Sequence, residues 1–405
     1  MFDTDLNEHQ SRLDRLQIAA LIGLMLVGVA FVYSATMVSA SAQSAAWYNQ
    51  SWFRQVVWYA LGIGAASALC FIDYRSLARF AIIIYWLSIF SLVLVLIPGI
   101  GSTHGWGARR WIDLGGPAQC QPSEFAKLAF ILAQAHFLSR PVEELQIPGN
   151  FFKALGMLML PFLLIMKEPD LGSALVLLPT GLAMLYVAGT PRRYLLRLLG
   201  LVGILGALFL VDVLFAPKNW QVKLEDYQMR RLRVYFGKEY TLAPGAPRAE
   251  IEKLRRQQLD DSFNMRQALI SVGSGGLTGK GWRQGTQNAL GYLPRLVAHN
   301  DFIFSVIAEE KGFVGSVTVL MLYGVVLFTG IRIAGQARDR LGKLLAVGVV
   351  ALLFSHVFIN IGMNIRIMPV AGVPLPLLSY GGSSVLVSLI AMGLLQNVCI
   401  HRKAY

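Results

Sequence analysis

Ten apolar runs separated by short polar segments dominate the pattern of hydrophobic and polar positions along this chain. They occupy residues 16–37, 56–72, 77–98, 124–138, 151–166, 171–189, 195–215, 312–333, 344–365 and 377–400. About 20 consecutive apolar residues in a helix cross the hydrocarbon core of a bilayer. The pattern therefore predicts an all-α, polytopic integral membrane protein, with all 405 residues in one membrane domain of about ten transmembrane helices. An even number of spans places both termini on one side.

The amino-acid composition is that of a protein that lies mostly within a lipid bilayer. Apolar residues make up 55% of the chain and charged residues 15%, and the mean hydropathy is +0.54. This balance excludes an ordinary soluble domain. The first run is longer than the apolar region of a signal peptide, so we expect it to be retained, although Ala40 and Ala42 resemble a cleavage site. The three cysteines imply no disulfide framework.

The basic residues predict the orientation. With the N-terminus inside, inner segments carry fifteen Lys and Arg residues, and short outer segments carry five: Arg54, Arg109, Arg110, Lys167 and Arg366. Cytoplasmic loops are enriched in Lys and Arg, whereas long loops escape the rule. We therefore expect both termini in the cytoplasm of a bacterial cell, and the 85-residue loop 216–300 outside the cytoplasmic (inner) membrane. The net charge of +13 thus reflects topology, and no nucleic-acid partner is expected.

The large outer loop, 216–300, contains a charged helical stretch, Ala249–Asp261, and then a glycine-rich region, so we expect a partly folded cap. The segment Gly273–Gly281 invites comparison with a phosphate-binding loop. However, Ser274 occupies the position of the first Walker glycine, and Gly281 replaces the Ser or Thr. An ATPase motif is excluded.

Charged residues at the outer helix ends are the first candidates for chemistry. Glu124 and Lys127 are three residues apart, so they share one helix face. Charges at membrane depth must face protein or a polar cavity, but a neutralising pair remains an alternative. Asp170 precedes the sixth run, where it is either a helix N-cap or part of a site.

Basic residues with aromatic neighbours form a second group of candidates. Arg109 and Arg110 precede Trp111, where they can bind phosphate oxygens or simply anchor the chain at the interface. The segment Asp226–Phe236 interleaves basic with aromatic and aliphatic residues, as a helix that contacts membrane lipids would.

Two further segments flank the last three runs. Asp301–Glu310 precedes Gly312–Ile333, which already spans the membrane, so it must pack at the outer mouth. Its first residue, Asp301, is either an N-cap or a catalyst. Prolines and glycines interrupt residues 369–382, which include Ser379, so this segment is either a structural kink or part of a site.

Taken together, these motifs resemble the shape, elongation, division and sporulation (SEDS) family over nearly the whole chain. The shared motifs are Arg110-Trp111-Ile112, Gln121-Pro122-Ser123-Glu124 with Lys127, Pro169-Asp170-Leu171-Gly172, Gly273-Ser274-Gly275-Gly276-Leu277, Asp301-Phe302-Ile303-Phe304, Gly372-Val373-Pro374-Leu375-Pro376 and Ser379-Tyr380-Gly381-Gly382-Ser383. Three motifs are more similar to the elongation members than to the division members: Gly279-Lys280-Gly281-Trp282, Gly285-Thr286-Gln287 and Val373-Pro374-Leu375-Pro376. Each motif alone is weak, but their common order is specific.

The resemblance implies a glycosyltransferase that polymerises lipid II into glycan strands during elongation and maintenance of rod shape. It also implies an outward-facing cavity and a partner, a class B penicillin-binding protein that acts as a monofunctional transpeptidase. Carried over by motif, the family's essential loop acid falls on Asp301, and its cavity charges fall on Glu124, Lys127 and Asp170. Arg109, Arg110 and Ser379 complete the expected substrate-binding residues.

The chain departs from the family pattern in the outer loop. Residues 237–262 form an enlarged segment, Arg295 stands where the family has Glu, and Asn300 replaces the common Thr. These departures bear on the local geometry of the loop, whereas Asp301-Phe302-Ile303-Phe304 is intact.

Sugar transfer from a lipid pyrophosphate needs a base at the acceptor hydroxyl and positive charge at the leaving group. We assign the base to Asp301 and the positive charge to Lys127, Arg109 and a divalent cation (Mg or Mn) whose ligands the sequence does not define, with no organic cofactor. The main alternative is a flippase or transporter for the lipid-linked precursor, since intramembrane charges and broken helices also mark transport pathways. A scaffold ranks last, because it has no need of charges within the bilayer.

Overall fold

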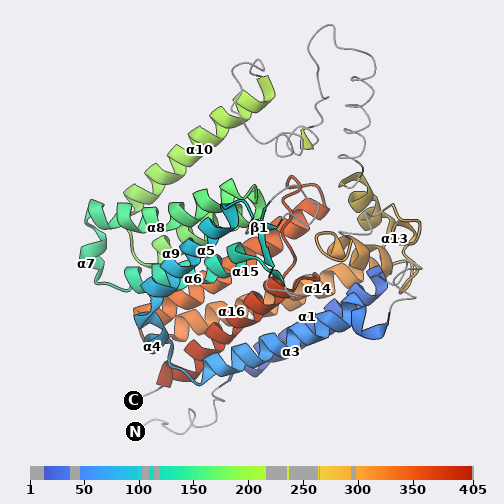
Figure 1. Ribbon diagram of the computed structural model, residues 1–405, viewed down its shortest axis with the longest axis horizontal. Helices are drawn as coiled ribbons and strands as arrows, with labels where there is room; N and C mark the ends of the chain where they lie inside the picture. The colour runs from blue at the N-terminus through green and yellow to red at the C-terminus, as the bar shows by residue number, and fades with distance from the viewer. Residues whose placement is uncertain are drawn as a thin grey trace.

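The computed structural model describes residues 13–36, 46–99, 101–102, 109–113, 119–215, 235–236, 263, 265–292 and 298–403. Each of the ten apolar runs coincides with a helix (Figure 1). In chain order these are α1 (Arg15–Thr36), α3 (Ser51–Cys70), α5 (Ala81–Leu96), α6 (Pro122–Leu138), α8 (Pro148–Lys167), α9 (Leu171–Val187), α10 (Arg192–Phe215), α14 (Ile303–Gln336), α15 (Arg340–Asn364) and α16 (Gly382–Ile400).

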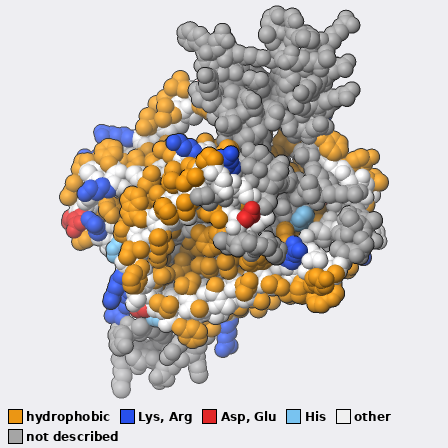
Figure 2. Space-filling view, in the orientation of Figure 1, with side chains coloured by type: hydrophobic (Ala, Val, Ile, Leu, Met, Phe, Trp, Pro, Cys, Tyr) orange, Lys and Arg blue, Asp and Glu red, His pale blue; other side chains and the backbone are white. Residues whose placement is uncertain are grey.

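Several of these helices have the length and hydropathy of membrane spans. Six are long and apolar enough to cross a bilayer, namely α1, α8, residues 192–212 of α10, α14, α15 and α16, and α5 and α9 are shorter apolar helices. Among the described residues, hydrophobic side chains predominate on the face that Figure 2 shows, and Lys and Arg occur in a few groups, several of them along the left edge. The prediction of an all-α, multi-span membrane protein is confirmed.

Short elements that hydropathy did not predict connect the spans. A three-stranded antiparallel sheet, β1 (Gly101–Ser102), β2 (Trp111–Asp113) and β3 (Gln119–Cys120), precedes α6. Short helices are η2 (Trp47–Asn49), α4 (Tyr74–Arg79), α7 (Val142–Leu145), α13 (Thr286–Ala289) and η3 (His401–Lys403). Two predicted boundaries were wrong: the chain breaks at Phe80 between α4 and α5, and the last span begins at Gly382 rather than 377, because residues 371–381 are not helical.

The centre of the bundle is α15, which packs against α6, α9, α14 and α16. In its most apolar window 72% of the residues are buried, compared with 6% for α10. Figure 1 shows α10 leaning away from the bundle. The side chains of α15, and those of α16 with 78% of its apolar window buried, are therefore well placed to join distant parts of the chain.

A kink at Gly312 divides α14, and the glycine-rich loop lies against it. Gly312 has φ 63° and ψ −157°, a backbone conformation that essentially only glycine adopts. The loop amides of Lys280 and Gly281 donate to the carbonyls of Glu309 and Glu310, at 3.0 Å each. Beyond the kink, the amide of Phe313 donates to the carbonyl of Gly276 (2.8 Å). The loop thus satisfies backbone groups that the kink frees. Gly275 and Gly279 allow its close approach, because a Cβ on them would lie 1.9 and 2.2 Å from carbonyl oxygens of α14.

The segment before the kink is buried, as we expected of Asp301–Glu310. Residues 302–310 are all buried, and the Glu310 carboxylate accepts hydrogen bonds from Ser34 Oγ (2.5 Å) and the Arg283 amide (3.0 Å). The expected helix Ala249–Asp261, most of Asp226–Phe236, the enlarged segment 237–262 and Arg295 lie outside the described residues.

Candidate active site

Glu124 and Lys127 form a buried ion pair at the start of α6. Lys127 Nζ lies 2.7 Å from Glu124 Oε1, as their spacing of three residues predicted. Lys127 Nζ also lies 3.0 Å from Nε2 of His356 on α15. Because an ammonium group only donates hydrogen bonds, Nε2 accepts, which requires the neutral imidazole with its proton on Nδ1. These two contacts use two of the three ammonium hydrogens.

A small cavity adjoins this cluster between α6, α15 and α16. Its lining includes Glu124, Lys127, His356 and Ser388, and its volume is about 20 Å³. This is room for about one water molecule. The third hydrogen of the Lys127 ammonium can therefore bind a polar group that enters the cavity.

Asp170 caps α9 and links it to α6. Its Oδ1 accepts a hydrogen bond from the Ser173 amide (3.1 Å), as a helix N-cap does, and its Oδ2 accepts one from Gln121 Nε2 (3.1 Å). Gln121 is the N-cap residue of α6. A Cβ on Gly172 would lie 2.3 Å from the Ala371 carbonyl oxygen, so a glycine there lets α9 approach the 371–381 segment. The N-cap prediction for Asp170 is confirmed.

The guanidinium group of Arg110 binds the turn between α8 and α9. Its guanidinium donates to the carbonyls of Glu168 (3.2 Å) and Pro169, and its Nη1 lies 4.0 Å from Asp170 Oδ1. Arg109, the preceding residue, is exposed to the surroundings. Of the two predicted phosphate ligands, Arg110 thus supports the turn, and Arg109 is the more accessible.

Glu168 lies in the same turn and was not predicted as a site residue. Its carboxyl group is buried, and the structure shows no hydrogen-bond partner for either oxygen within the described residues. Burial and, to a smaller extent, the negative charge of Asp170 raise the pKa of Glu168 to about 9, despite the opposing effect of Arg110. Glu168 is therefore protonated at neutral pH.

Asp301 is positioned by two asparagine side chains of α15. Asn360 Nδ2 and Asn364 Nδ2 donate to the Asp301 carbonyl oxygen, at 3.0 and 3.1 Å. The N-cap position of α14 belongs to Phe302 rather than Asp301. The main chain of Asp301 is thus held against the central helix.

Ser379 fixes the residue before Asp301. Its Oγ donates to the Asn300 carbonyl oxygen (2.5 Å) and accepts from the Leu375 amide (2.8 Å). The Tyr380 amide also donates to the His299 carbonyl oxygen (2.9 Å). Residues 371–381 therefore act as a platform for the loop that carries Asp301, and Ser379 is a part of this platform.

The structure brings these residues together through α6 and α15. One turn of α15 separates Asn360, which contacts the Asp301 carbonyl, from His356, which contacts Lys127. Near the first turn of α6, Gln121 contacts Asp170 and Glu124 contacts Lys127. His356, Asn360 and Asn364 were not among the predicted site residues, although their spacing of four positions within an apolar run places them on one helix face and could have revealed them.

No group of three or more His, Cys, Asp or Glu side chains that could hold a metal ion occurs among the described residues. Both oxygens of Asp170 already accept hydrogen bonds, and Glu124 pairs with Lys127. Mg²⁺ is commonly bound by one or two carboxylates together with substrate phosphates, so a single acid suffices when the substrate supplies oxygen ligands.

Comparisons with known proteins agree with the motif pattern. The model of the cell cycle protein family that comprises FtsW, RodA and SpoVE matches residues 14–404. The peptidoglycan glycosyltransferase MrdB of Escherichia coli (strain K12) is 37% identical over 312 residues, which cover 77% of this chain and 76% of MrdB. Stage V sporulation protein E of Bacillus subtilis (strain 168) is 38% identical over 346 residues, 85% of this chain and 86% of the relative.

Solved structures share the fold. A chain from a peptidoglycan synthase complex that coordinates polymerization and crosslinking has a TM-score of 0.73 and 28% identity, covering 97% of this chain and 99% of its own. The rod shape determining protein RodA of Thermus thermophilus has a TM-score of 0.64 and 28% identity, covering 97% and 98%.

The chain belongs to the FtsW, RodA and SpoVE family, the SEDS family of multi-pass membrane proteins. It is a peptidoglycan glycosyltransferase, similar to MrdB and RodA, with a role in cell shape and elongation.

Proposed function

We propose that the chain polymerises lipid II at the outer face of the bacterial cytoplasmic membrane, with Asp301 as the general base. The observation that carries this proposal is the placement of Asp301. Asn360 and Asn364 hold its main chain on the same helix whose His356 contacts the buried Lys127. An acid and a buried lysine are thus tied to one rigid element, as a preorganised site requires.

In this mechanism the Asp301 carboxylate accepts the proton of the 4-hydroxyl group of the acceptor sugar. The hydroxyl oxygen forms a bond to the anomeric carbon of the donor from the face opposite its pyrophosphate, so the configuration inverts. The bond between that carbon and the pyrophosphate oxygen breaks, and the lipid pyrophosphate leaves.

Positive charge at the departing pyrophosphate stabilises the transition state. Arg109 is exposed and can reach an outer phosphate, whereas Lys127, whose cavity has room for about one water molecule, contributes positive charge from within the protein. Arg110 and Asp170 hold the α8–α9 turn in place, and Glu124 keeps Lys127 oriented. Ser379 contributes by fixing the loop rather than by direct contact.

A divalent cation, Mg²⁺ or Mn²⁺, would bind the pyrophosphate oxygens of the substrate and would supply additional charge stabilisation there. The partner in the proposal is a class B penicillin-binding protein, because a similar chain was solved within a peptidoglycan synthase complex.

The experiment that tests the proposal is polymerisation of lipid II by the purified full chain with its partner in detergent, where no second membrane face exists. A polymerase lengthens glycan strands under these conditions. A flippase leaves the substrate unpolymerised, and this result would refute the proposal. Chelation of divalent cations in the same assay tests the cation, since activity that is unaffected by chelation excludes it.

A further inference from the structure

A large cavity lies at the end of the bundle opposite Asp170. It has a volume of about 680 Å³ and lies between the end of α9, the start of α10, the end of α14 and the start of α15. Asp170 caps one end of α9 and Gly189 follows the other, about 25 Å away for a helix of 17 residues. The cavity is therefore separate from the site described above.

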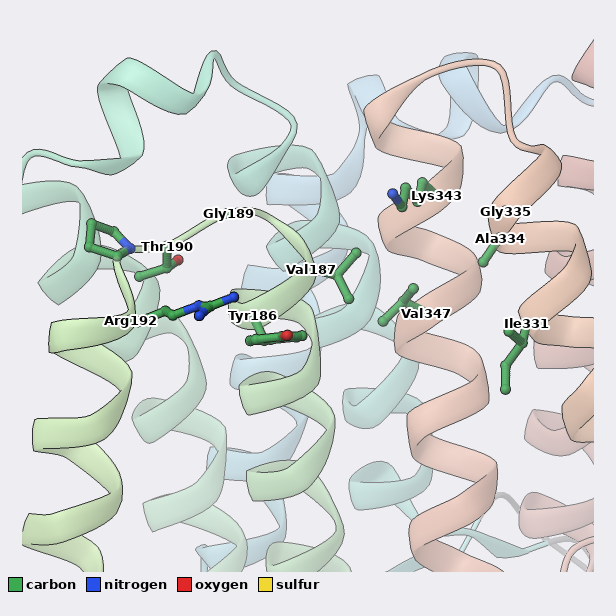
Figure 3. A pocket seen from close by; sticks show the side chains of 11 residues that line it. Tyr186, Val187, Gly189, Thr190, Arg192, Ile331, Ala334, Gly335, Lys343 and Val347 are labelled. Atoms are coloured by element: carbon green, nitrogen blue, oxygen red, sulfur yellow. The ribbon is translucent and has the colours of Figure 1, made fainter.

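The lining changes from charged to apolar along the helices. On α15, Lys343 is one turn closer to the helix end than Val347, and on α14 Ile331 is one turn deeper than Gly335. Figure 3 shows Arg192 extending from α10 toward Tyr186 of α9, with Val347 and Ile331 on the opposite wall.

The apolar part of this cavity is open rather than closed by protein. Tyr186 is 62% exposed and Ile331 is 61% exposed. Both lie in helices that the hydropathy pattern places in the membrane, so lipid chains are the surroundings that these side chains meet. A hydrocarbon chain can therefore enter the cavity from the side.

The two cations that line the cavity have no carboxylate partner in the part of the chain that the structure describes. Arg192 and Lys343 are exposed, and neither forms an ion pair with a carboxylate within the described ranges. Arg340, three residues before Lys343, donates to the Ala188 carbonyl oxygen (2.8 Å) and adds a third positive charge at the same rim. A ligand with negative charge at the membrane surface complements this rim.

We propose that this cavity binds an anionic phospholipid of the inner leaflet. Arg192 and Lys343 contact the headgroup phosphate, and the acyl chains lie along Tyr186, Ile331 and Val347. Basic pockets between transmembrane helices on the cytoplasmic side are suited to such headgroups. The assignment to the inner leaflet rests on the proposed function, which places the Asp301 site at the outer face. The binding of an anionic lipid in this cavity does not depend on that orientation.

The test is native mass spectrometry of the full-length protein, purified in detergent micelles that contain equal amounts of phosphatidylglycerol and phosphatidylcholine. The protein with the natural sequence is expected to retain more phosphatidylglycerol than phosphatidylcholine. Each basic residue near a membrane surface strengthens binding of an anionic lipid about fivefold, so Arg192→Gln with Lys343→Gln should weaken retention about 30-fold. The matched control, Arg79→Gln with Lys153→Gln, removes two exposed charges of the predicted inner face outside the cavity and should leave retention unchanged.

A second pair of variants tests the volume of the cavity without changing its charge. A Cβ on Gly335 or on Gly324 of α14 would meet no atom within 4 Å. Gly335 lines the cavity and Gly324 does not, so Gly335→Leu should displace the lipid and Gly324→Leu should not.

Equal retention of both lipids, or an equal loss in the cavity variants and their controls, would overturn the proposal. Neither measurement uses polymerisation. Asp301→Asn should retain phosphatidylglycerol like the natural sequence, so failure of the lipid site and failure of the proposed catalytic mechanism give different results.

Discussion

The ammonium nitrogen of Lys127 lies 2.7 Å from Oε1 of Glu124, and the two side chains are 0% and 3% exposed. Burial of a single ion costs several kcal/mol unless a partner compensates for the lost solvation. Each of these two charges therefore offsets the free-energy cost of burying the other. The pair also ties α6 to His356 of α15, the central helix.

Loss of Lys127 alone should destabilise the protein strongly. Lys127→Met leaves the Glu124 carboxylate buried without its ion partner, and we expect the free energy of unfolding to fall by about 3–5 kcal/mol. Adding Glu124→Gln should recover part of this loss, because no unpaired charge remains. Thermal unfolding in detergent measures both effects, with the exposed Lys153→Met as control. If Lys127→Met unfolds at the temperature of the control, the pair does not stabilise the fold.

Asp301→Asn should separate a structural from a catalytic role. The asparagines of α15 bind the main-chain carbonyl of Asp301, so the substitution leaves these hydrogen bonds intact. It removes the basicity needed to accept a proton, and polymerisation should fall by roughly two to four orders of magnitude while expression and partner binding persist. Asp113→Asn, at an exposed acid of β2, is the control. A folded Asp301→Asn variant with near-normal strand synthesis would refute the catalytic role.

Glu168 should make stability depend on pH. Its pKa rises from 4.5 in the unfolded chain to about 9 in the folded protein, so the folded state retains the proton over this range. The stability that this proton supplies is complete below pH 4.5 and is lost as the pH rises toward 9. The unfolding temperature should therefore fall between pH 6 and pH 9. Glu168→Gln, which cannot ionise, should show a smaller fall, and an identical pH profile would contradict the assignment.

Gly312→Ala should damage the loop against the kink of α14. The glycine has φ 63°, and a Cβ there would lie 2.4 Å from the Gly279 amide nitrogen. We expect the free energy of unfolding to fall by about 1–3 kcal/mol, together with a lower rate of polymerisation. Gly324→Ala is the matched control, since its Cβ meets no atom within 4 Å on the same helix. Equal stability of the two variants would show that the kink tolerates a side chain.

The orientation can be tested with reporters. A fusion after Lys403 should remain in the cytoplasm, and a tag inserted near Pro244 should be accessible from outside, because fifteen basic residues hold the alternate loops inside. Protease protection in spheroplasts measures both. A tag near Pro244 that is protected in intact spheroplasts would reverse the topology.

Local features of this protein could be read from the sequence. The helices at the ten apolar runs follow from hydropathy, because the bilayer requires each spanning helix to be apolar on its own. The Glu124–Lys127 pair and the Asp170 cap follow from spacings of three residues within one helix or its first turn. The family motifs added the glycosyltransferase activity, which the comparisons confirm.

Contacts between distant parts of the chain were decided only by the tertiary structure. Lys127 meets His356 across 229 positions, and Asp301 meets Asn360 across 59. Hydropathy could not place Glu168 in a buried turn, because burial of a carboxyl depends on the neighbouring helices and not on its own segment. The cavity at Arg192 and Lys343 likewise exists only where four helix ends meet. Periodicity determines which face of a helix is apolar, but the packing of the helices determines which side chains face each other.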